Sequence, residues 1–287
     1  TPLGSLMREY WIPVIRSAEI VAGAPPVRVK ILGENFVAYR TPSGQAGFMD
    51  EACPHRGASM MLACNEDGGL RCVYHGWKVA PDGGVVEAPT HPEDAPLDRI
   101  RSRAHPVVEK HGIVWSWLGR GAPAAFPQLV ISDLADDQVV AANCVINCSW
   151  LHPLETLWDV FHAQILHNQT NRKSMRSQAY FGGQATRKAG NIGFNYPEMT
   201  VQRTEYGFTY INSDVAKETQ FQFVLPFTQF HAVTPGPNDD RAFQMSVPID
   251  DEHCLLWMVF YNKAGALKPD GFAWQGLGKL PDLGNML

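Results

Sequence analysis

The sequence predicts an α+β protein with two domains, an antiparallel β domain followed by a domain in which a helix packs on an antiparallel sheet. Three observations lead to this prediction. Short strand-like runs bounded by Gly, Pro or Asp fill the first 120 residues. A single strong amphipathic helix pattern begins near Pro153, and strand-like runs return after residue 200. The length of 287 residues accommodates two domains that each have a hydrophobic core.

The first domain is predicted to span residues 1–120. Val27, Val29 and Ile31 alternate with polar or basic neighbours, and residues 33–35 can turn the chain into a second strand at 36–39. Further short strands are expected at residues 46–49, 69–73, 84–87 and 113–118. Frequent turn signals between such short strands favour a small antiparallel β domain.

The second domain is predicted to span residues 121–287, after a segment at 119–137 that is rich in Gly, Pro and Ala. A strand is expected at 139–146, followed by the helix. Further strands are expected at 208–211, 219–225, 242–247 and 254–261. The apolar face of the helix consists of residues at three- and four-residue spacing: Leu154, Leu157, Trp158, Phe161 and Ile165.

Composition excludes several classes of protein. The formal net charge is 24 − 29 = −5 and Lys and Arg do not cluster, which argues against nucleic-acid or anionic-membrane partners. The longest apolar runs are far shorter than the ~20 residues that span a bilayer, and the N-terminus has no secretory pattern. We therefore expect a soluble, cytoplasmic chain. Six cysteines are too few for a disulfide scaffold.

Two short segments pair a cysteine with a histidine. Cys53 and His55 lie in CPHRG, and Cys72 and His75 lie in CVYHGW. Zinc fingers usually group Cys with Cys and His with His, whereas a Rieske [2Fe–2S] cluster has one iron on two Cys and the other on two His. The spacing therefore predicts a Rieske cluster, with Gly57 and Gly76 in tight turns beside it. A structural zinc site, or two unrelated Cys/His pairs, is the alternative.

These segments resemble the cluster motif of Rieske-type non-haem iron aromatic ring-hydroxylating oxygenases, in particular the terminal oxygenase (alpha) subunits of the phthalate-dioxygenase-like group. TPLGSLMREYWIPV and ILGENFVAYR are also similar to that group. Respiratory Rieske proteins carry a further Cys in each loop, where this chain has Ala58 and Tyr74. The resemblance implies an N-terminal Rieske domain and a C-terminal, helix-grip-like catalytic domain.

The predicted helix contains a second candidate metal motif, ETLWDVFHAQILH. Asp159 and His162 are three residues apart and share a helical face with Glu155. His167 lies five residues after His162, so both can bind one metal only if the helix is distorted or ends between them. Two His and one carboxylate form the facial triad of non-haem Fe(II) oxygenases. From the residues alone, two ordinary polar or core histidines remain the alternative.

The spacing of Asp159, His162 and His167 is similar to the mononuclear-iron motif of the same family. The resemblance implies that the two histidines bind Fe(II). It also implies that Asp159 is not a ligand but connects His162 to His75 of a neighbouring subunit. The family's third iron ligand is a carboxylate on a late helix, and no segment here matches that helix. The chain ends at LPDLGNML, so we expect that ligand to lie outside the sequence, in a missing C-terminal part.

The resemblance further implies a terminal oxygenase that uses O2 and electrons from an NAD(P)H-dependent reductase carrying flavin and an iron–sulfur centre. It implies a homotrimer, or a dimer of trimers. The expected reaction is cis-dihydroxylation of a phthalate-like aromatic acid, with Arg172 and Arg176 as candidates for holding the carboxylate. Oxidative O-demethylation of a methoxylated aromatic acid is the first alternative. A Rieske electron carrier and a zinc-stabilised structural protein are the others.

Overall fold

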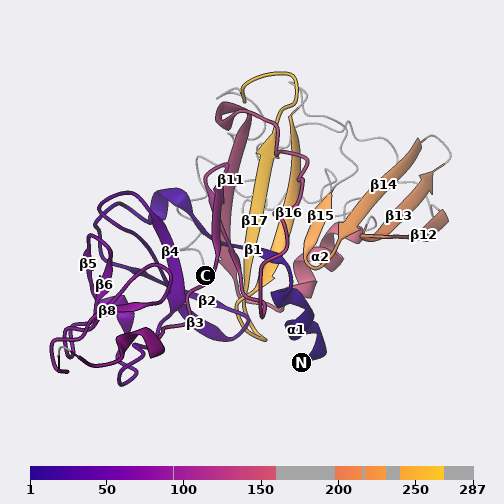
Figure 1. The fold of residues 1–287 in the computed structure, drawn as a ribbon. Coiled ribbons are helices and arrows are strands. Elements are labelled where there is room, and N and C mark those ends of the chain that lie inside the picture. Colours follow the sequence, from indigo (N-terminus) through magenta and orange to yellow (C-terminus); the bar gives the residue numbers. More distant parts are fainter. Residues whose placement is uncertain (93, 160–197, 215–216, 231–239, 268–287) are drawn as a thin grey trace, which may run out of the picture. The chain divides into compact units, whose positions relative to one another are not determined.

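The computed structural model describes residues 1–92, 94–159, 198–214, 217–230 and 240–267 (Figure 1). The chain divides into two compact units, which are described separately. The first unit comprises Thr1–Asp136 and Val247–Asp251, and the second comprises Asp137–Ser246 and Glu252–Leu287. The predicted division at residues 120 and 121 stays a prediction.

The first unit contains a short helix and three small sheets. Helix α1 (Pro2–Arg8) begins at Thr1, whose hydroxyl accepts a hydrogen bond from the backbone of Gly4. The sheets have the strand orders β1-β10-β9, β2-β3-β4 and β5-β6-β7-β8. The strands are β1 (Trp11–Arg16), β2 (Val27–Ile31), β3 (Glu34–Arg40), β4 (Ala46–Asp50), β5 (Cys64–Glu66), β6 (Gly69–Arg71), β7 (Lys78–Val79), β8 (Val85–Glu87), β9 (Val107–Lys110) and β10 (Ile113–Trp117).

The hairpin between β2 and β3 turns earlier than the sequence predicts. Ile31 pairs with Glu34, so Leu32 and Gly33 alone form the turn, with φ of 53° and 80°. Positive φ at both central positions is typical of the two-residue turns whose twist matches that of the flanking strands. Asn35, which was expected in the turn, therefore lies in β3 and pairs with Lys30.

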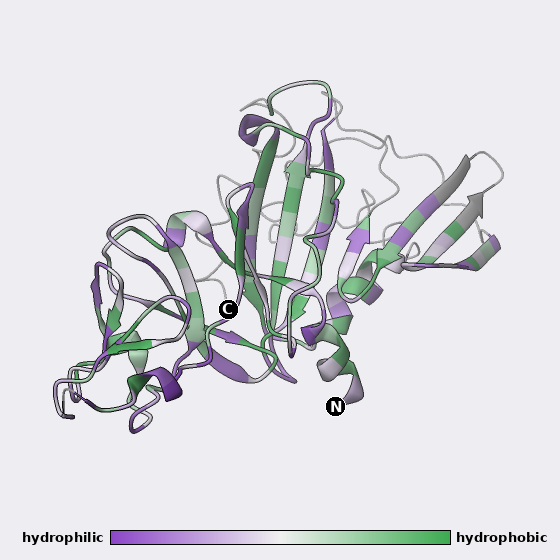
Figure 2. Cartoon of the chain, in the orientation of Figure 1, coloured by the Kyte–Doolittle hydropathy of each residue, from purple (hydrophilic) through white to green (hydrophobic). Residues whose placement is uncertain are grey.

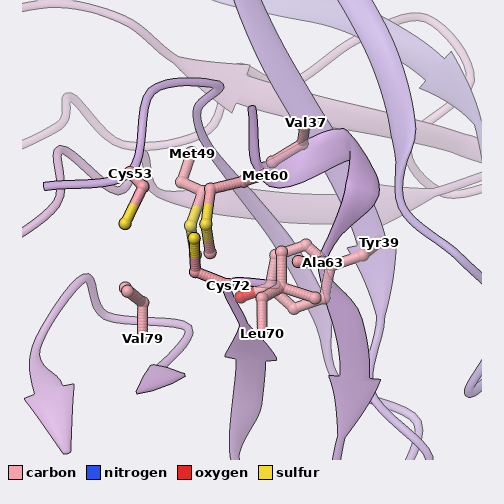
Figure 3. Packing of buried hydrophobic residues seen from close by; sticks show 9 residues of the cluster. All are labelled: Val37, Tyr39, Met49, Cys53, Met60, Ala63, Leu70, Cys72 and Val79. Atoms are coloured by element: carbon pink, nitrogen blue, oxygen red, sulfur yellow. The ribbon is translucent and has the colours of Figure 1, made fainter. Parts of the chain in front are cut away.

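A group of buried apolar side chains includes the cysteines of both Cys/His segments (Figure 3). It draws on β3, β4, β6 and β7 and on the 3-10 helix Met60–Leu62. The group consists of Val37, Tyr39, Met49, Cys53, Met60, Ala63, Leu70, Cys72 and Val79. Cys53 and Cys72 belong to this core, which gives both thiols a rigid base.

The second unit is built on one seven-stranded sheet with the order β11-β17-β16-β15-β14-β13-β12. Its strands are β11 (Val139–Ile146), β12 (Glu198–Thr204), β13 (Gly207–Asp214), β14 (Lys217–Val224), β15 (Thr228–Phe230), β16 (Arg241–Pro248) and β17 (Cys254–Tyr261). The interior strand β17 is hydrophobic over most of its length, whereas the edge strand β12 is mixed (Figure 2) and largely exposed. This contrast is expected, because an edge strand has only one neighbour.

Helix α2 (Leu151–Trp158) packs on this sheet. The Trp158 ring lies 5.2 Å from Phe208 of β13 and 5.6 Å from Phe223 of β14, measured between ring centroids. The Gln244 amide of β16 donates to the carbonyl of Pro153 at 3.4 Å. The predicted α+β class, with a helix on an antiparallel sheet in the second half, is confirmed.

The extent of the helix differs from the prediction. Leu154 is fully buried, as the apolar stripe requires. The helix ends at Trp158, however, because Asp159 turns the chain with ψ of 95°, although its N–H still bonds to Glu155 at 3.1 Å. At the C-cap, Asp159 still lies one turn after Glu155, whereas His162, which was expected to share this face, lies outside the described residues. Phe161 and Ile165 lie outside the described residues.

Among the residues that the structure describes, no helix combines the length and the hydropathy needed to cross a membrane.

Candidate functional site

The two Cys/His segments form loops with the same backbone frame. In the first loop, residues 53–58, the N–H of Cys53 donates to Ala58 at 2.9 Å, and the N–H of Gly57 donates back to Cys53 at 2.9 Å. In the second loop, residues 72–77, Cys72 donates to Trp77 at 2.8 Å and Gly76 donates to Cys72 at 3.0 Å.

Each loop therefore has Cys in its first position and Gly in its fifth. The φ angles are 71° at Gly57 and 74° at Gly76, in the left-handed region that favours glycine. The histidine is third in the first loop and fourth in the second. Each loop thus carries one thiol and one imidazole on the same backbone frame.

A charged side chain anchors each loop: an acidic residue for the first loop and a basic residue for the second. Glu51, just before the first loop, binds the Arg28 guanidinium at 2.9 Å and the Ser59 hydroxyl. Arg71, just before the second loop, donates to the Gly76 carbonyl at 2.9 Å. We call residues 53–58 and 72–77 the cluster loops, and these anchors connect them to the neighbouring strands.

The two thiols are buried side by side. Cys53 is 4% exposed and Cys72 is 2% exposed, and Figure 3 shows the Cys72 sulfur among the side chains of the apolar group. Burial raises the pKa of the Cys53 thiol, and the adjacent Cys72 raises it further, whereas a hydrogen bond from the His55 backbone acts in the opposite direction. A bound metal would supply the positive charge that favours the thiolate form of Cys53.

The two imidazoles also meet. The rings of His55 and His75 lie 4.6 Å apart between centroids, at an interplanar angle of 73°. Burial holds the pKa of His55 below its ordinary value, and His75 and Arg56 lower it further. His55 Nδ1 is buried without a hydrogen-bond partner. A neutral imidazole with a free ring nitrogen is the form that binds a metal.

These donors fit a two-iron cluster better than one zinc ion. The four side chains form a thiol pair and an imidazole pair, which is the donor set of a Rieske [2Fe–2S] centre. A tetrahedral zinc site would need four such ligands around a single point.

Of the second predicted site, the structure describes Asp159 alone. Asp159 is exposed at the end of α2. Asp159 affects the pKa of Tyr210 on β13. Burial raises the pKa of this phenol, and the nearby Asp159 carboxylate raises it further. The remaining predicted residues, His162, His167, Arg172 and Arg176, lie outside the described residues.

Sequence reasoning missed four residues that surround the cluster loops: Glu51, Arg71, Trp77 and His91. The Trp77 ring stacks on His55 at 4.5 Å with an interplanar angle of 4°. The His91 ring meets both of them edge-on. Trp77 directly follows the HG of CVYHGW, so its position in the motif was a usable signal. Nothing in APTHP marks His91 as a neighbour of the cluster.

Comparison with known families matches both parts of the chain. Residues 10–107 match the Rieske [2Fe-2S] domain. Residues 116–279, more than half of the chain, match the family described as LigXa C-terminal domain like. The first match implies a [2Fe–2S] cluster, and the oxygenases that combine these two domains also use a mononuclear iron.

Three relatives are oxygenase subunits. The chain is 34% identical to the 3-chlorobenzoate-3,4-dioxygenase oxygenase subunit of Comamonas testosteroni, over 94% of this chain and 62% of the relative. It is 33% identical to the phthalate 4,5-dioxygenase oxygenase subunit of Pseudomonas putida, over 91% and 61%. It is 32% identical to the 5,5'-dehydrodivanillate O-demethylase oxygenase subunit of a Sphingobium strain, over 92% and 60%. The chain thus spans about three fifths of the length of these relatives.

Solved structures share the fold. Dicamba monooxygenase bound to dicamba aligns with a TM-score of 0.65 at 20% identity, over 88% of this chain and 77% of that one. The terminal oxygenase of carbazole 1,9a-dioxygenase from Nocardioides aromaticivorans aligns with a TM-score of 0.71 at 20% identity, over 99% and 82%. With both domain matches and the curated relatives, these likenesses show that the chain belongs to the family of Rieske non-haem iron oxygenase alpha subunits.

Proposed function

We propose that this chain acts as the terminal oxygenase of a multicomponent system that oxidises an aromatic acid with O2. The observation that carries the proposal is that two loops with one repeated frame bring their thiols next to each other and their imidazoles next to each other. When bound, the [2Fe–2S] cluster supplies single electrons and the mononuclear Fe(II) supplies O2 activation.

In this proposal Cys53 and Cys72 hold one iron of the cluster, and His55 and His75 hold the other. The thiols lie inside the apolar core, where thiolates bound to metal are protected from water and oxidants. The imidazoles lie toward the surface, each half-buried. The histidine side is therefore the side through which electrons enter or leave.

We assign Asp159 the role of linking the cluster to the iron site of a neighbouring subunit. A carboxylate between two ligand imidazoles orients both rings and shortens the path for an electron. Its exposure at the end of α2 leaves it accessible to another chain. The assignment requires an oligomer, and a homotrimer or a dimer of trimers remains the proposed state.

The iron ligands His162 and His167 follow from the sequence motif. The third carboxylate ligand is left unassigned. Arg172 and Arg176 are proposed to hold a substrate carboxylate, because a guanidinium binds a carboxylate through two parallel hydrogen bonds. We expect cis-dihydroxylation of a phthalate-like acid, which the names of two relatives support.

Oxidative O-demethylation of a methoxylated aromatic acid is the second candidate, which the O-demethylase relative favours. Turnover of phthalate and of a methoxybenzoate distinguishes the two reactions. A cis-diol product supports dihydroxylation. Release of formaldehyde without a cis-diol would instead establish the demethylase.

The proposed electron donor is an NAD(P)H-dependent reductase with flavin and an iron–sulfur centre. The proposed location of the reaction is the cytoplasm. Val73 and Tyr74, within the second loop, are 57% and 63% exposed. Exposed apolar side chains next to a redox centre are suited to a contact with another protein. This surface is therefore proposed to meet a partner.

The experiment that tests the proposal is Asp159→Asn in the full-length protein. The amide keeps the shape of the side chain but loses its charge and one acceptor. We expect about three iron atoms per chain in both proteins, with turnover coupled to the reductase nearly abolished in the variant. Unchanged turnover would rule out the linking role. About two iron atoms per chain in the wild type would indicate an electron carrier instead.

A further inference from the structure

The two histidines of the cluster loops have different surroundings, although their loops share a frame. The His75 ring contacts the ring of His55 and that of the exposed Tyr74, at a centroid distance of 4.0 Å from the latter. His55 instead lies among three further rings, those of His75, Trp77 and His91. The environment of His55 is therefore the more constrained.

Two of those rings enclose His55 from different directions. Trp77 lies parallel to it, with a centroid distance of 4.5 Å and an interplanar angle of 4°. His91 lies edge-on to His55 at 5.6 Å and edge-on to Trp77 at 5.0 Å. Both arrangements are favourable for aromatic pairs. A ring held by a parallel and a perpendicular neighbour cannot rotate without losing contacts.

Residues 88–91, which we call the third loop, hold His91 in this place. The Trp77 indole N–H donates to the Thr90 hydroxyl at 3.3 Å, and that hydroxyl lies 3.3 Å from His91 Nδ1. The His91 N–H donates to Ala88 at 2.9 Å, which closes the loop. The loop also packs tightly on the second loop, since a Cβ at Gly76 would lie 2.9 Å from Pro89 Cγ.

We propose that His91, together with Trp77, fixes the plane of the His55 ring, so that His91 is a positioning residue for the cluster although it is no part of the ligand motif. This inference rests on the proposed function, because it takes His55 to be an iron ligand. Orientation of a ligand ring by its surroundings sets the overlap with the metal and tunes the reduction potential. The clamp acts on one histidine and leaves His75 to face a partner.

The test uses the full-length holoenzyme, reduced and examined by pulsed EPR, with the reduction potential measured at one pH. His91→Ala removes the ring, His91→Phe retains a ring, and Thr90→Val removes the bridging hydroxyl. Tyr74→Leu is the matched control, because it removes the ring that contacts the other histidine. We expect His91→Ala to change the nitrogen coupling of one histidine and to shift the potential. His91→Phe should restore both quantities toward the wild type, and Thr90→Val should have a smaller effect.

Tyr74→Leu should leave the coupling that responds to His91→Ala unchanged. Equal changes at both histidines, or wild-type couplings and potential in His91→Ala, would overturn the proposal. If His91→Ala loses the cluster, restoration of the cluster by His91→Phe supports the clamp, and failure to restore it overturns the clamp. A wild type without histidine-coupled nitrogen would refute the proposed cluster itself, a result distinct from an unaltered variant.

Discussion

The first and second cluster loops have one backbone frame but different supports. Both place a buried Cys first and a left-handed Gly fifth. The first is anchored through the carboxylate of Glu51 and the second through the guanidinium of Arg71. The repeated frame accounts for the pairing of like donors. The rings that surround His55 come from other parts of the domain, Trp77 from the second loop and His91 from the third.

We expect the largest effect when a substitution removes a metal-binding donor from either loop. Cys53→Ser or Cys72→Ser replaces a thiolate with a hydroxyl, which is a poor ligand for iron in such clusters. We expect each variant to lose the cluster's visible absorbance and nearly all turnover. Cys64→Ser is the matched control, since Cys64 is exposed on β5. Equal losses of absorbance and turnover in all three variants would show that the domain is sensitive to any cysteine substitution and not specifically to the loss of a cluster ligand.

Alanine substitution of the fifth-position glycine is expected to lower the thermal stability by a different amount in each loop. Gly57→Ala places a Cβ in open space, so its cost comes from the positive φ alone, about 1 kcal/mol. Gly76→Ala has the same strain and also brings its Cβ to 2.9 Å from Pro89. Thermal unfolding of the holoprotein should show a fall in Tm of about 2–4 °C for Gly57→Ala and a clearly larger fall for Gly76→Ala. Equal shifts in Tm would show that the third loop moves to accommodate the added Cβ at little cost in stability.

The smallest effects concern the two anchors. The Arg28 hydrogen bond, assisted by Ser59, holds the pKa of Glu51 below its ordinary value, whereas burial opposes this shift. Because the folded pKa is depressed, the stabilisation is fully present above the ordinary pKa of about 4.3 and is lost as the pH falls through the lower folded value. The loss of Tm in Glu51→Gln should therefore be constant between about pH 6 and pH 8. A loss that varied across that range would contradict this assignment.

Arg71 differs because its own side chain is 28% exposed and that of its partner Glu87 is 50% exposed, whereas the Glu51 side chain is 11% exposed. Exposed ion pairs contribute about 0–1 kcal/mol and are screened by salt. We expect Arg71→Gln to lower Tm by less than Glu51→Gln does, and the difference from the wild type to shrink in high salt. Thermal unfolding at two salt concentrations measures this. An effect independent of salt would point instead to the hydrogen bond from Arg71 to the Gly76 carbonyl.

The donor set of the cluster loops could be predicted from the sequence because all four donors lie in two short motifs with diagnostic spacing. The supports could not, since a single Glu or Arg before a cysteine is common on any protein surface. His91 belongs to a separate loop, and its approach to His55 depends on how the third loop folds over Gly76. Tertiary contacts of this kind leave no local pattern.

The second half of the chain shows the same limit on prediction from sequence. The apolar stripe correctly predicted a helix packed through Leu154 and Trp158. The stripe continues past Trp158 in the sequence, whereas the chain leaves the helix at Asp159. Periodicity reports which residues can share a face, but it does not report where a backbone turns away. The class of the fold was therefore more predictable than the end of the element that carries Asp159.

The central claim is that one iron of the cluster is held by His55 and His75. Pulsed EPR of the reduced full-length protein tests it most directly, because ligand nitrogens couple to the unpaired electron. We predict two coupled histidine nitrogens in the wild type, with one of them lost in any His75→Cys variant that retains its cluster. A reduced cluster without histidine coupling, or a colourless protein that contains zinc, would contradict the claim.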